Sequence, residues 1–197
     1  YPPSPKALEA LQKFEGEWLR RYPDPYAQEF CTIAAATLGI PTDWLIVGNG
    51  CDELLGLLMR ACVGHPGCAL VSTTPTYSLY RILAELCGAD NIIEVHYAPD
   101  NEFPLEQLIQ AAGALTLIAS PNSPSGHQVS LPELRQLAEA VPGILAIDEA
   151  YVDFGTDSAL TLVREYTHVV VLRTLSKGYS LAGLRFGFGV AQPKLLE

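Results

Sequence analysis

One lysine lies in the part of the chain with the most distinctive chemistry. Lys177 follows an apolar run and is preceded by Ser176, and Arg185 comes eight residues later after a stretch of small residues. An amine at the end of a buried strand loses hydration, which favours its neutral, nucleophilic form. Ser176 and Arg185 could both bind a phosphate group, the arginine through two parallel hydrogen bonds. The segment predicts a nucleophilic amine beside an anion site, and the alternative is a surface lysine on a loop.

Two adjacent carboxylates, Asp148 and Glu149, end another apolar run. A carboxylate at the end of a buried strand is costly unless it is paired. Asp148 could face a protonated aromatic nitrogen of a ligand, and Tyr151 could donate a hydrogen bond to an oxygen on the same ring. On its own, the segment also fits a magnesium-binding Asp-Glu pair or a general-acid carboxylate.

A glycine-rich turn, Gly48-Asn49-Gly50, leads into a predicted helix. The backbone N–H groups of Cys51 and Asp52 would then lie at a helix N-terminus, where the helix dipole favours a phosphate. The turn has neither the Gly-Lys-Ser/Thr ending of a Walker motif nor the Gly-x-Gly-x-x-Gly pattern. Taken alone, it could equally be an ordinary turn.

Two further side chains could contact a flat ligand. Tyr77 follows a predicted strand and could stack on a heteroaromatic ring, although a core or capping tyrosine is equally consistent with the local sequence. Asn122 lies in a loop with two prolines and could offer its amide to a ring oxygen.

Short apolar segments alternate with amphipathic segments along most of the chain. The predicted strands cover residues 44–47, 68–71, 92–95, 115–119, 144–147, 168–172 and 185–190. The predicted helices cover residues 4–20, 27–38, 52–61, 76–86, 104–112 and 132–140. This alternation predicts an α/β fold in which a mostly parallel sheet lies between two layers of helices, as three α/β/α layers.

The polar segments described above each follow a predicted strand. In open parallel sheets the ligand site lies at the carboxyl ends of the strands. We therefore expect five loops to converge on one edge of the sheet: 48–53, 72–77, 120–126, 148–151 and 174–177.

Composition excludes several other classes of function. The formal net charge of −10 argues against nucleic-acid binding, which needs clustered basic charge, and against docking on an anionic membrane. No apolar run is long enough to cross a bilayer. The five cysteines form no Cys-x-x-Cys pair, which favours reduced thiols in a cytoplasmic protein over a disulfide or zinc framework.

Taken together and in order, these segments resemble the fold-type-I aminotransferases that use pyridoxal 5'-phosphate (PLP), and within them the histidinol-phosphate aminotransferase family. The resemblance extends over nearly the whole chain. It is carried by the segments 1–5, 22–24, 50–53, 75–80, 120–126, 148–151, 176–177 and 183–185. It implies that the chain contains the large PLP-binding domain of the aspartate aminotransferase-like fold.

The resemblance also implies roles for individual residues. Lys177 would hold the cofactor covalently and then move a proton between the substrate and the cofactor, and Asp148 would pair with the pyridine nitrogen. Tyr151 and Asn122 would bind the ring oxygen, and Tyr77 would stack on the ring. The cofactor phosphate would be held by the amides of Cys51 and Asp52, by Ser176 and Arg185, and by Tyr22 of a neighbouring subunit in a homodimer.

Two departures from the family qualify this assignment. Many relatives have Asn directly before the second proline of the 120–126 loop, where this chain has Ser123. The family also continues into a small C-terminal domain, which we expect to follow the last residue of this chain and to complete the substrate site. We expect residues 1–28 to form an N-terminal helical segment and residues 29–197 to form the large domain.

The reaction that the resemblance implies is reversible amino-group transfer between an amino acid or amino-alcohol phosphate and a 2-oxo acid. The implied pair is histidinol phosphate with 2-oxoglutarate, giving imidazole acetol phosphate and glutamate in histidine biosynthesis. Alternatives with the same cofactor are a threonine-phosphate decarboxylase and an aromatic amino-acid aminotransferase. A non-catalytic PLP-binding fragment and a metal-dependent α/β hydrolase using Asp148 and Glu149 are alternatives of other classes.

Overall fold

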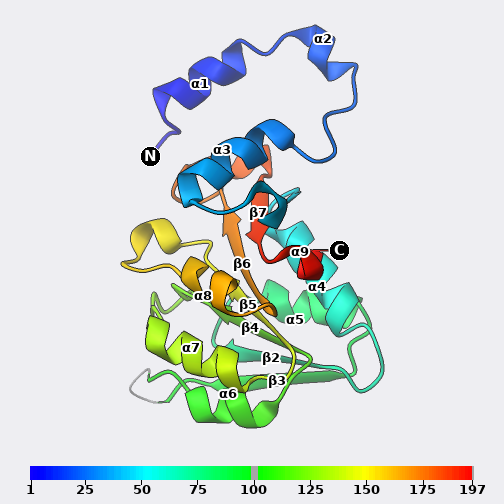
Figure 1. The fold of residues 1–197 in the computed structure, drawn as a ribbon, viewed down its shortest axis with the longest axis vertical. Helices are drawn as coiled ribbons and strands as arrows, with labels where there is room; N and C mark the ends of the chain where they lie inside the picture. Colours follow the sequence, from blue (N-terminus) through cyan, green and yellow to red (C-terminus); the bar gives the residue numbers. More distant parts are fainter. Residues whose placement is uncertain (99–101, 197) are drawn as a thin grey trace.

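One seven-stranded sheet organises the computed structural model, which describes residues 1–98 and 102–196 (Figure 1). The strand order is β1-β7-β6-β5-β4-β2-β3. The strands are β1 Leu45–Gly48, β2 Ala69–Thr74, β3 Asn91–His96, β4 Leu115–Ala119, β5 Ile144–Asp148, β6 Val169–Thr174 and β7 Gly187–Val190. Only β7 runs antiparallel to its neighbours, β1 and β6, and the other pairings are parallel.

Helices cover both faces of this sheet, which confirms the predicted three-layer α/β/α architecture. The α-helices are α1 Pro5–Gln12, α2 Gly16–Leu19, α3 Gln28–Leu38, α4 Cys51–Cys62, α5 Leu79–Leu86, α6 Leu105–Ala111, α7 Leu131–Ala140, α8 Leu160–Glu165 and α9 Pro193–Leu196. Short 3-10 turns lie at Thr42–Trp44, Val152–Phe154 and Ala182–Leu184.

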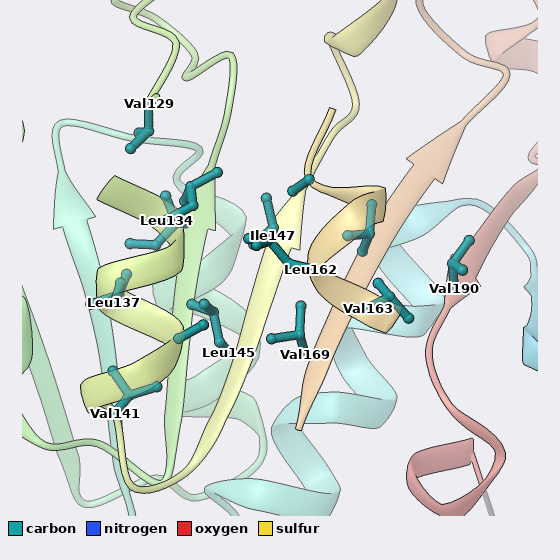
Figure 2. Packing of buried hydrophobic residues seen from close by; sticks show 14 of the residues in the cluster. Val129, Leu134, Leu137, Val141, Leu145, Ile147, Leu162, Val163, Val169 and Val190 are labelled. Atoms are coloured by element: carbon teal, nitrogen blue, oxygen red, sulfur yellow. The ribbon is translucent and has the colours of Figure 1, made fainter. Parts of the chain in front are cut away.

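The core has one cluster on each face of the sheet. On one face, α6 packs on β2 and β3 and α8 packs on β6, with α7 beside α6. Figure 2 shows Leu134 and Leu162 in the same cluster as Leu145 and Ile147 of β5. On the other face, α4 and α5 contribute Leu55 and other side chains that are fully buried. Burial of the central strands on both faces explains their continuous apolar sequences.

The first predicted helix is wrong in length. Residues 4–20 form two helices, α1 and α2, instead of one. Ser4 caps α1 by accepting a hydrogen bond from the Ala7 N–H, as its position before Pro5 favours. Neither helix has a buried residue, so the apolar side chains that suggested one helix are not buried here. Gly16 weakens the junction between the two helices.

The other differences concern short elements. Helix α8 was not predicted, because its six residues are too few to show a helical period. Helix α5 begins at Leu79, three residues later than predicted, and β7 begins at Gly187, two residues later than predicted. The end of the second predicted helix is confirmed, since Gly39 follows α3 in the left-handed conformation with φ +65°.

The strand directions bring the predicted loops to one edge. Strands β2, β4, β5 and β6 are parallel, and β1 shares their direction because it and β6 both run against β7. The loops are tied to neighbouring strands, since Ser120 N–H donates to the Asp148 carbonyl and Glu149 N–H to the Leu172 carbonyl, both at 2.9 Å. Among the described residues, every helix is too short or too polar to cross a bilayer.

Candidate active site

The predicted loops enclose a cavity of about 210 Å³ at the carboxyl edge of the sheet. Eight of the ten residues expected to bind the cofactor line it, which confirms that these loops converge. They are Cys51, Asp52, Tyr77, Asp148, Tyr151, Ser176, Lys177 and Arg185. The cavity therefore combines an amine, a buried carboxylate, a guanidinium group and aromatic rings.

Asp148 lies at the end of β5 and is only 5% exposed. Its Oδ2 accepts a hydrogen bond from the Tyr80 hydroxyl at 2.6 Å, and its Oδ1 accepts one from the Ala150 N–H at 2.9 Å. Burial raises the pKa of the Asp148 carboxyl, and these two hydrogen bonds oppose that rise by stabilising the carboxylate. Asp148 thus offers a nearly dry, hydrogen-bonded acid to the cavity.

Sequence reasoning gave Tyr80 no role, although it is 1% exposed and lines the same cavity. Its ring packs edge-on against Tyr77, with ring centroids 5.6 Å apart and an interplanar angle of 88°. The signal was present in the spacing, because residues three apart near the start of a helix lie on the same side.

Lys177 lies three residues beyond the end of β6 and lines the cavity with Asp148. Its Nζ lies 5.3 Å from the centroid of the Tyr151 ring, within the range of a cation–π contact. The Lys177 side chain is exposed, so the expected loss of hydration is wrong for this structure. The reason is its position, since the loop after β6 has already left the layers of helices that cover the strand.

Hydrogen-bond donors of the kind that bind an anion form part of the same cavity lining. Cys51 and Asp52 begin α4, where the first N–H groups have no partners within the helix. The Arg185 guanidinium lies beside this turn and donates from Nη2 to Asp52 Oδ2 at 2.9 Å. Ser176 also lines this cavity, and its N–H donates to the Thr174 hydroxyl oxygen at 3.1 Å.

Two glycines permit this close packing. A Cβ on Gly50 would lie 2.5 Å from Arg185 Nη2, and Gly50 has φ +83°, which side chains disfavour. A Cβ on Gly187 would lie 2.5 Å from the backbone nitrogen of Cys51. The start of α4, the start of β7 and the guanidinium can therefore approach one another only with glycine at both positions.

Asn122 and Tyr22 do not line this cavity in the described structure. The Asn122 amide nitrogen donates to the Pro75 carbonyl at 3.0 Å and to Ser125 Oγ at 2.8 Å, and its oxygen accepts from Thr76 Oγ1 at 2.6 Å. Asn122 thus holds two of the converging loops together. Tyr22 is fully exposed, in the N-terminal segment that extends away from the sheet (Figure 1). The ligand contacts expected for both residues stay predictions.

Glu149 lies away from Asp148 despite being its neighbour in sequence. It lines a different pocket and accepts hydrogen bonds from Arg173 Nε at 2.9 Å and from Ser158 Oγ at 3.0 Å. Burial raises the pKa of the Glu149 carboxyl, and the Arg173 guanidinium opposes this. Within the residues that the structure describes, no group of three or more His, Cys, Asp or Glu side chains could hold a metal. The geometry gives the Asp148–Glu149 metal alternative no support.

Comparison with known proteins defines the family. The family described as aminotransferase class I and II matches residues 1–197. The chain belongs to this family, as its layered α/β fold and its lysine-containing cavity also indicate.

Within this family, the chain is similar in sequence to curated proteins named histidinol-phosphate aminotransferase. The chain is 59% identical over 197 residues to histidinol-phosphate aminotransferase 1 of Trichormus variabilis, covering 100% of this chain and 56% of that protein. It is 54% identical to the protein of the same name from Nostoc sp., covering 100% of this chain and 55% of that protein. The chain thus spans about half the length of the curated relatives it matches.

A solved structure gives the same picture. Histidinol-phosphate aminotransferase from Sinorhizobium meliloti, crystallised in complex with pyridoxal-5'-phosphate, superposes with a TM-score of 0.87 and 29% sequence identity. The match covers 98% of this chain and 54% of that one.

Proposed function

We propose that this chain is the cofactor-binding part of a pyridoxal-phosphate-dependent aminotransferase. The observation that carries the proposal is that Lys177 and Asp148 line one cavity with the Arg185 anion-binding arrangement. A sheet edge that served only for packing would have no need of a buried, desolvated carboxylate facing an amine.

The donor set fits pyridoxal phosphate at each of its three reactive parts. The cofactor has an aldehyde, a pyridine nitrogen and a phosphate, and the cavity offers an amine, a buried carboxylate and a guanidinium beside helix amides. Gly50 leaves room for that guanidinium, and Gly187 lets β7 lie against the start of α4. An anion at this position would meet both the positive end of α4 and the charge of Arg185.

When bound, pyridoxal phosphate supplies an electron sink for negative charge that develops on the substrate α carbon. Asp148 would hold a proton on the pyridine nitrogen, because a buried carboxylate strongly favours a neighbouring cation. Tyr77 would stack on the ring face. Tyr151 would donate a hydrogen bond to the ring oxygen while its ring stays close to the Lys177 amine.

Lys177 would attach the cofactor and then move a proton between the substrate α carbon and C4′ of the cofactor. Its position after β6, on a loop reaching over the cavity, suits both tasks. The Cys51 and Asp52 amides, Ser176 and Arg185 would hold the phosphate. Asn122 would act on the ring oxygen only after one of its present donor contacts is exchanged, since both lie within the loops.

The proposed substrates are histidinol phosphate and 2-oxoglutarate, with imidazole acetol phosphate and glutamate as products. This choice rests on the 59% identity to a protein named for that reaction. We further propose a cytoplasmic homodimer in which Tyr22 reaches the cofactor phosphate of the partner. Residues 1–28 would form the N-terminal helical segment, and residues 29–197 the large domain. Residues 99–101 and 197 of that domain lie outside the described residues.

A single-turnover assay on the full-length protein tests this function. The protein is loaded with pyridoxal phosphate, and histidinol phosphate is added without a 2-oxo acid. We expect the bound cofactor to convert to its amine form, seen as loss of its visible absorption band, and 2-oxoglutarate to restore the band.

Parallel reactions separate the alternatives. Threonine phosphate with carbon dioxide detection tests the decarboxylase, and phenylalanine tests the aromatic aminotransferase. Conversion with phenylalanine but not with histidinol phosphate would overturn the proposed substrate. Loading without conversion by any donor would overturn the proposed enzymatic activity.

A further inference from the structure

The Tyr80 hydroxyl donates a short hydrogen bond to the Asp148 carboxylate. Tyr80 comes from the first turn of α5, and Asp148 from the end of β5, so two separate elements meet at this bond. The donor-acceptor distance is 2.6 Å, and the two residues are 1% and 5% exposed. A hydrogen bond to a charged acceptor is stronger and shorter than a neutral one, particularly where water is excluded.

The two hydrogen bonds to Asp148 fix its carboxylate plane. The Ala150 N–H holds Oδ1 and comes from the loop that carries Asp148 itself, so it moves with that loop. Tyr80 holds Oδ2 from an independent helix. Each carboxylate oxygen has two lone-pair sites, so one remains on Oδ2 for a further donor.

Charged groups around Asp148 act on it in both directions. The Asp52 carboxylate, from α4, disfavours a negative charge on Asp148, and the Lys177 amine favours it. The Cys51 thiol, also from α4, would repel the carboxylate only if it ionised, and burial raises its pKa. Tyr77, beside Tyr80 on the same side of the cavity, would repel the carboxylate only if it ionised. Only proline at position 150 would remove the Ala150 N–H, and it would also constrain the backbone. The Tyr80 hydroxyl is therefore the donor of this pair that a side-chain substitution removes without changing the backbone.

We propose that Tyr80 is a positioning residue that keeps Asp148 ionised and aimed at the cofactor ring nitrogen. This inference rests on the proposed cofactor. It also gives a role to the edge-to-face contact of Tyr80 with Tyr77, because the start of α5 and the turn before it then position both the ring-stacking group and the carboxylate. Tyr80 touches no reacting atom in this scheme and acts through Asp148.

The primary test uses the cofactor-free full-length protein, so that it is independent of catalysis. Aspartate carboxyl carbons are labelled with carbon-13, and the Asp148 signal is assigned by its loss in Asp148→Asn. We expect Tyr80→Phe to raise the titration midpoint of Asp148 by about one pH unit, the size expected for losing a charged hydrogen bond. Tyr80→3-fluorotyrosine, a stronger donor of almost the same shape, should lower the midpoint.

Tyr77→Phe is the matched control. It removes a hydroxyl from the neighbouring ring, but that hydroxyl contacts Asp52 Oδ1 at 3.4 Å and makes no hydrogen bond to Asp148. The Asp148 midpoint should therefore stay nearly unchanged. If Tyr80→Phe fails to fold, the fluorotyrosine variant still decides. An unchanged Asp148 midpoint in the fluorotyrosine variant, or equal shifts in Tyr77→Phe and Tyr80→Phe, would overturn the inference.

A second readout concerns the bound cofactor. With pyridoxal phosphate labelled with nitrogen-15 in the ring, the Tyr80→Phe signal should move toward the unprotonated position, while mass spectrometry still finds the cofactor on Lys177. A protonated ring nitrogen in Tyr80→Phe, identical to wild type, would contradict the role of Tyr80. Failure of the wild-type protein to bind pyridoxal phosphate would instead contradict the proposed function, so the two failures are distinguishable.

Discussion

Arg185 and Asp52 form an ion pair in the lining of the cavity, with Nη2 and Oδ2 2.9 Å apart. Each side chain is 45% exposed, so the pair contributes little to stability. The ion pair matters for position instead, because it holds the Arg185 guanidinium beside the first turn of α4. Arg185 also adopts a left-handed backbone conformation, with φ +51°, which is uncommon for a residue other than glycine.

Arg185→Met should weaken binding of pyridoxal phosphate by about 10- to 100-fold, the range for losing a hydrogen bond between charged groups. Binding of pyridoxal, which has no phosphate, should change little. The measurement is fluorescence titration with both ligands. Arg60→Met, in the last turn of the same helix, is the control and should leave both affinities unchanged. Equal losses for the two ligands would show that Arg185 does not act on the phosphate.

Gly187→Ala should separate β7 from the start of α4. The new Cβ would lie 2.5 Å from the Cys51 nitrogen, where only backbone could give way. We expect a loss of about 1–3 kcal/mol in the free energy of unfolding, as for other overpacked sites, together with weaker phosphate binding. Gly183→Ala is the control, because a Cβ there meets nothing within 4 Å. The measurement is chemical unfolding of both variants. Equal free energies of unfolding for Gly187→Ala and Gly183→Ala would contradict the close approach of β7 to the start of α4.

Arg173→Met should destabilise the fold through Glu149. The Glu149 side chain is 2% exposed and that of Arg173 17%, so the substitution leaves a buried carboxylate without its ion-pair partner. Such losses cost about 3–5 kcal/mol. Arg135→Met is the control, since it breaks an exposed pair with Glu165 and should change stability little.

The pH dependence of the Arg173 variant follows from the same burial. The pKa of Glu149 is already raised, and removal of Arg173 raises it further. A carboxyl group whose pKa is raised by folding stabilises the folded state fully at a pH below its ordinary pKa. This stabilisation is lost as the pH rises through the pKa of the group in the folded protein. The deficit of Arg173→Met should therefore shrink in acid. A deficit that is constant with pH would show that lost packing, and not charge, is responsible.

The sequence predicted the sheet well because buried parallel strands leave a strong apolar signal. Strands such as Leu115–Ala119, buried along their whole length, could be read almost to the residue. The N-terminal segment was misread, because the apolar spacing of Leu8 and Leu11 suggests a buried helix face that the described fold does not bury. Helix α8 was missed since its six residues carry no period, and packing on β6 decides its structure.

The residues of the site were predictable from the order of several motifs along the chain, while each motif alone left alternatives open. Lys177, Asp148 and Arg185 line the cavity as expected. The exposure of Lys177 was not predictable, because hydration depends on how the loop leaves the sheet. The Tyr80 contact was missed because tyrosine in an apolar helix is usually a core residue, and only the packing of α5 on the sheet reveals its hydroxyl partner.

Asp148→Asn should stabilise the cofactor-free protein at neutral pH. The folded-state pKa of Asp148 lies above its ordinary value of 3.8, chiefly because of burial. The Asp148 carboxyl therefore contributes its full stabilisation in acid, where it is protonated. That contribution is lost as the pH rises through the pKa that Asp148 has in the folded protein. Removing the charge should raise the free energy of unfolding by about 1 kcal/mol at neutral pH. The carboxylate would then be a residue that serves function and lowers stability. Urea unfolding across the pH range checks this, and a less stable Asp148→Asn at neutral pH would contradict it.

The central claim is that the Lys177 amine holds the cofactor, and the chain has only three other lysines, Lys6, Lys13 and Lys194. The direct measurement is borohydride reduction of the protein with pyridoxal phosphate, followed by digestion and mass spectrometry. The account predicts that the reduced cofactor is found on the peptide containing Lys177 and that Lys177→Ala carries none. Modification of another lysine in preference to Lys177, or equal labelling of the Lys177→Ala protein, would contradict the account.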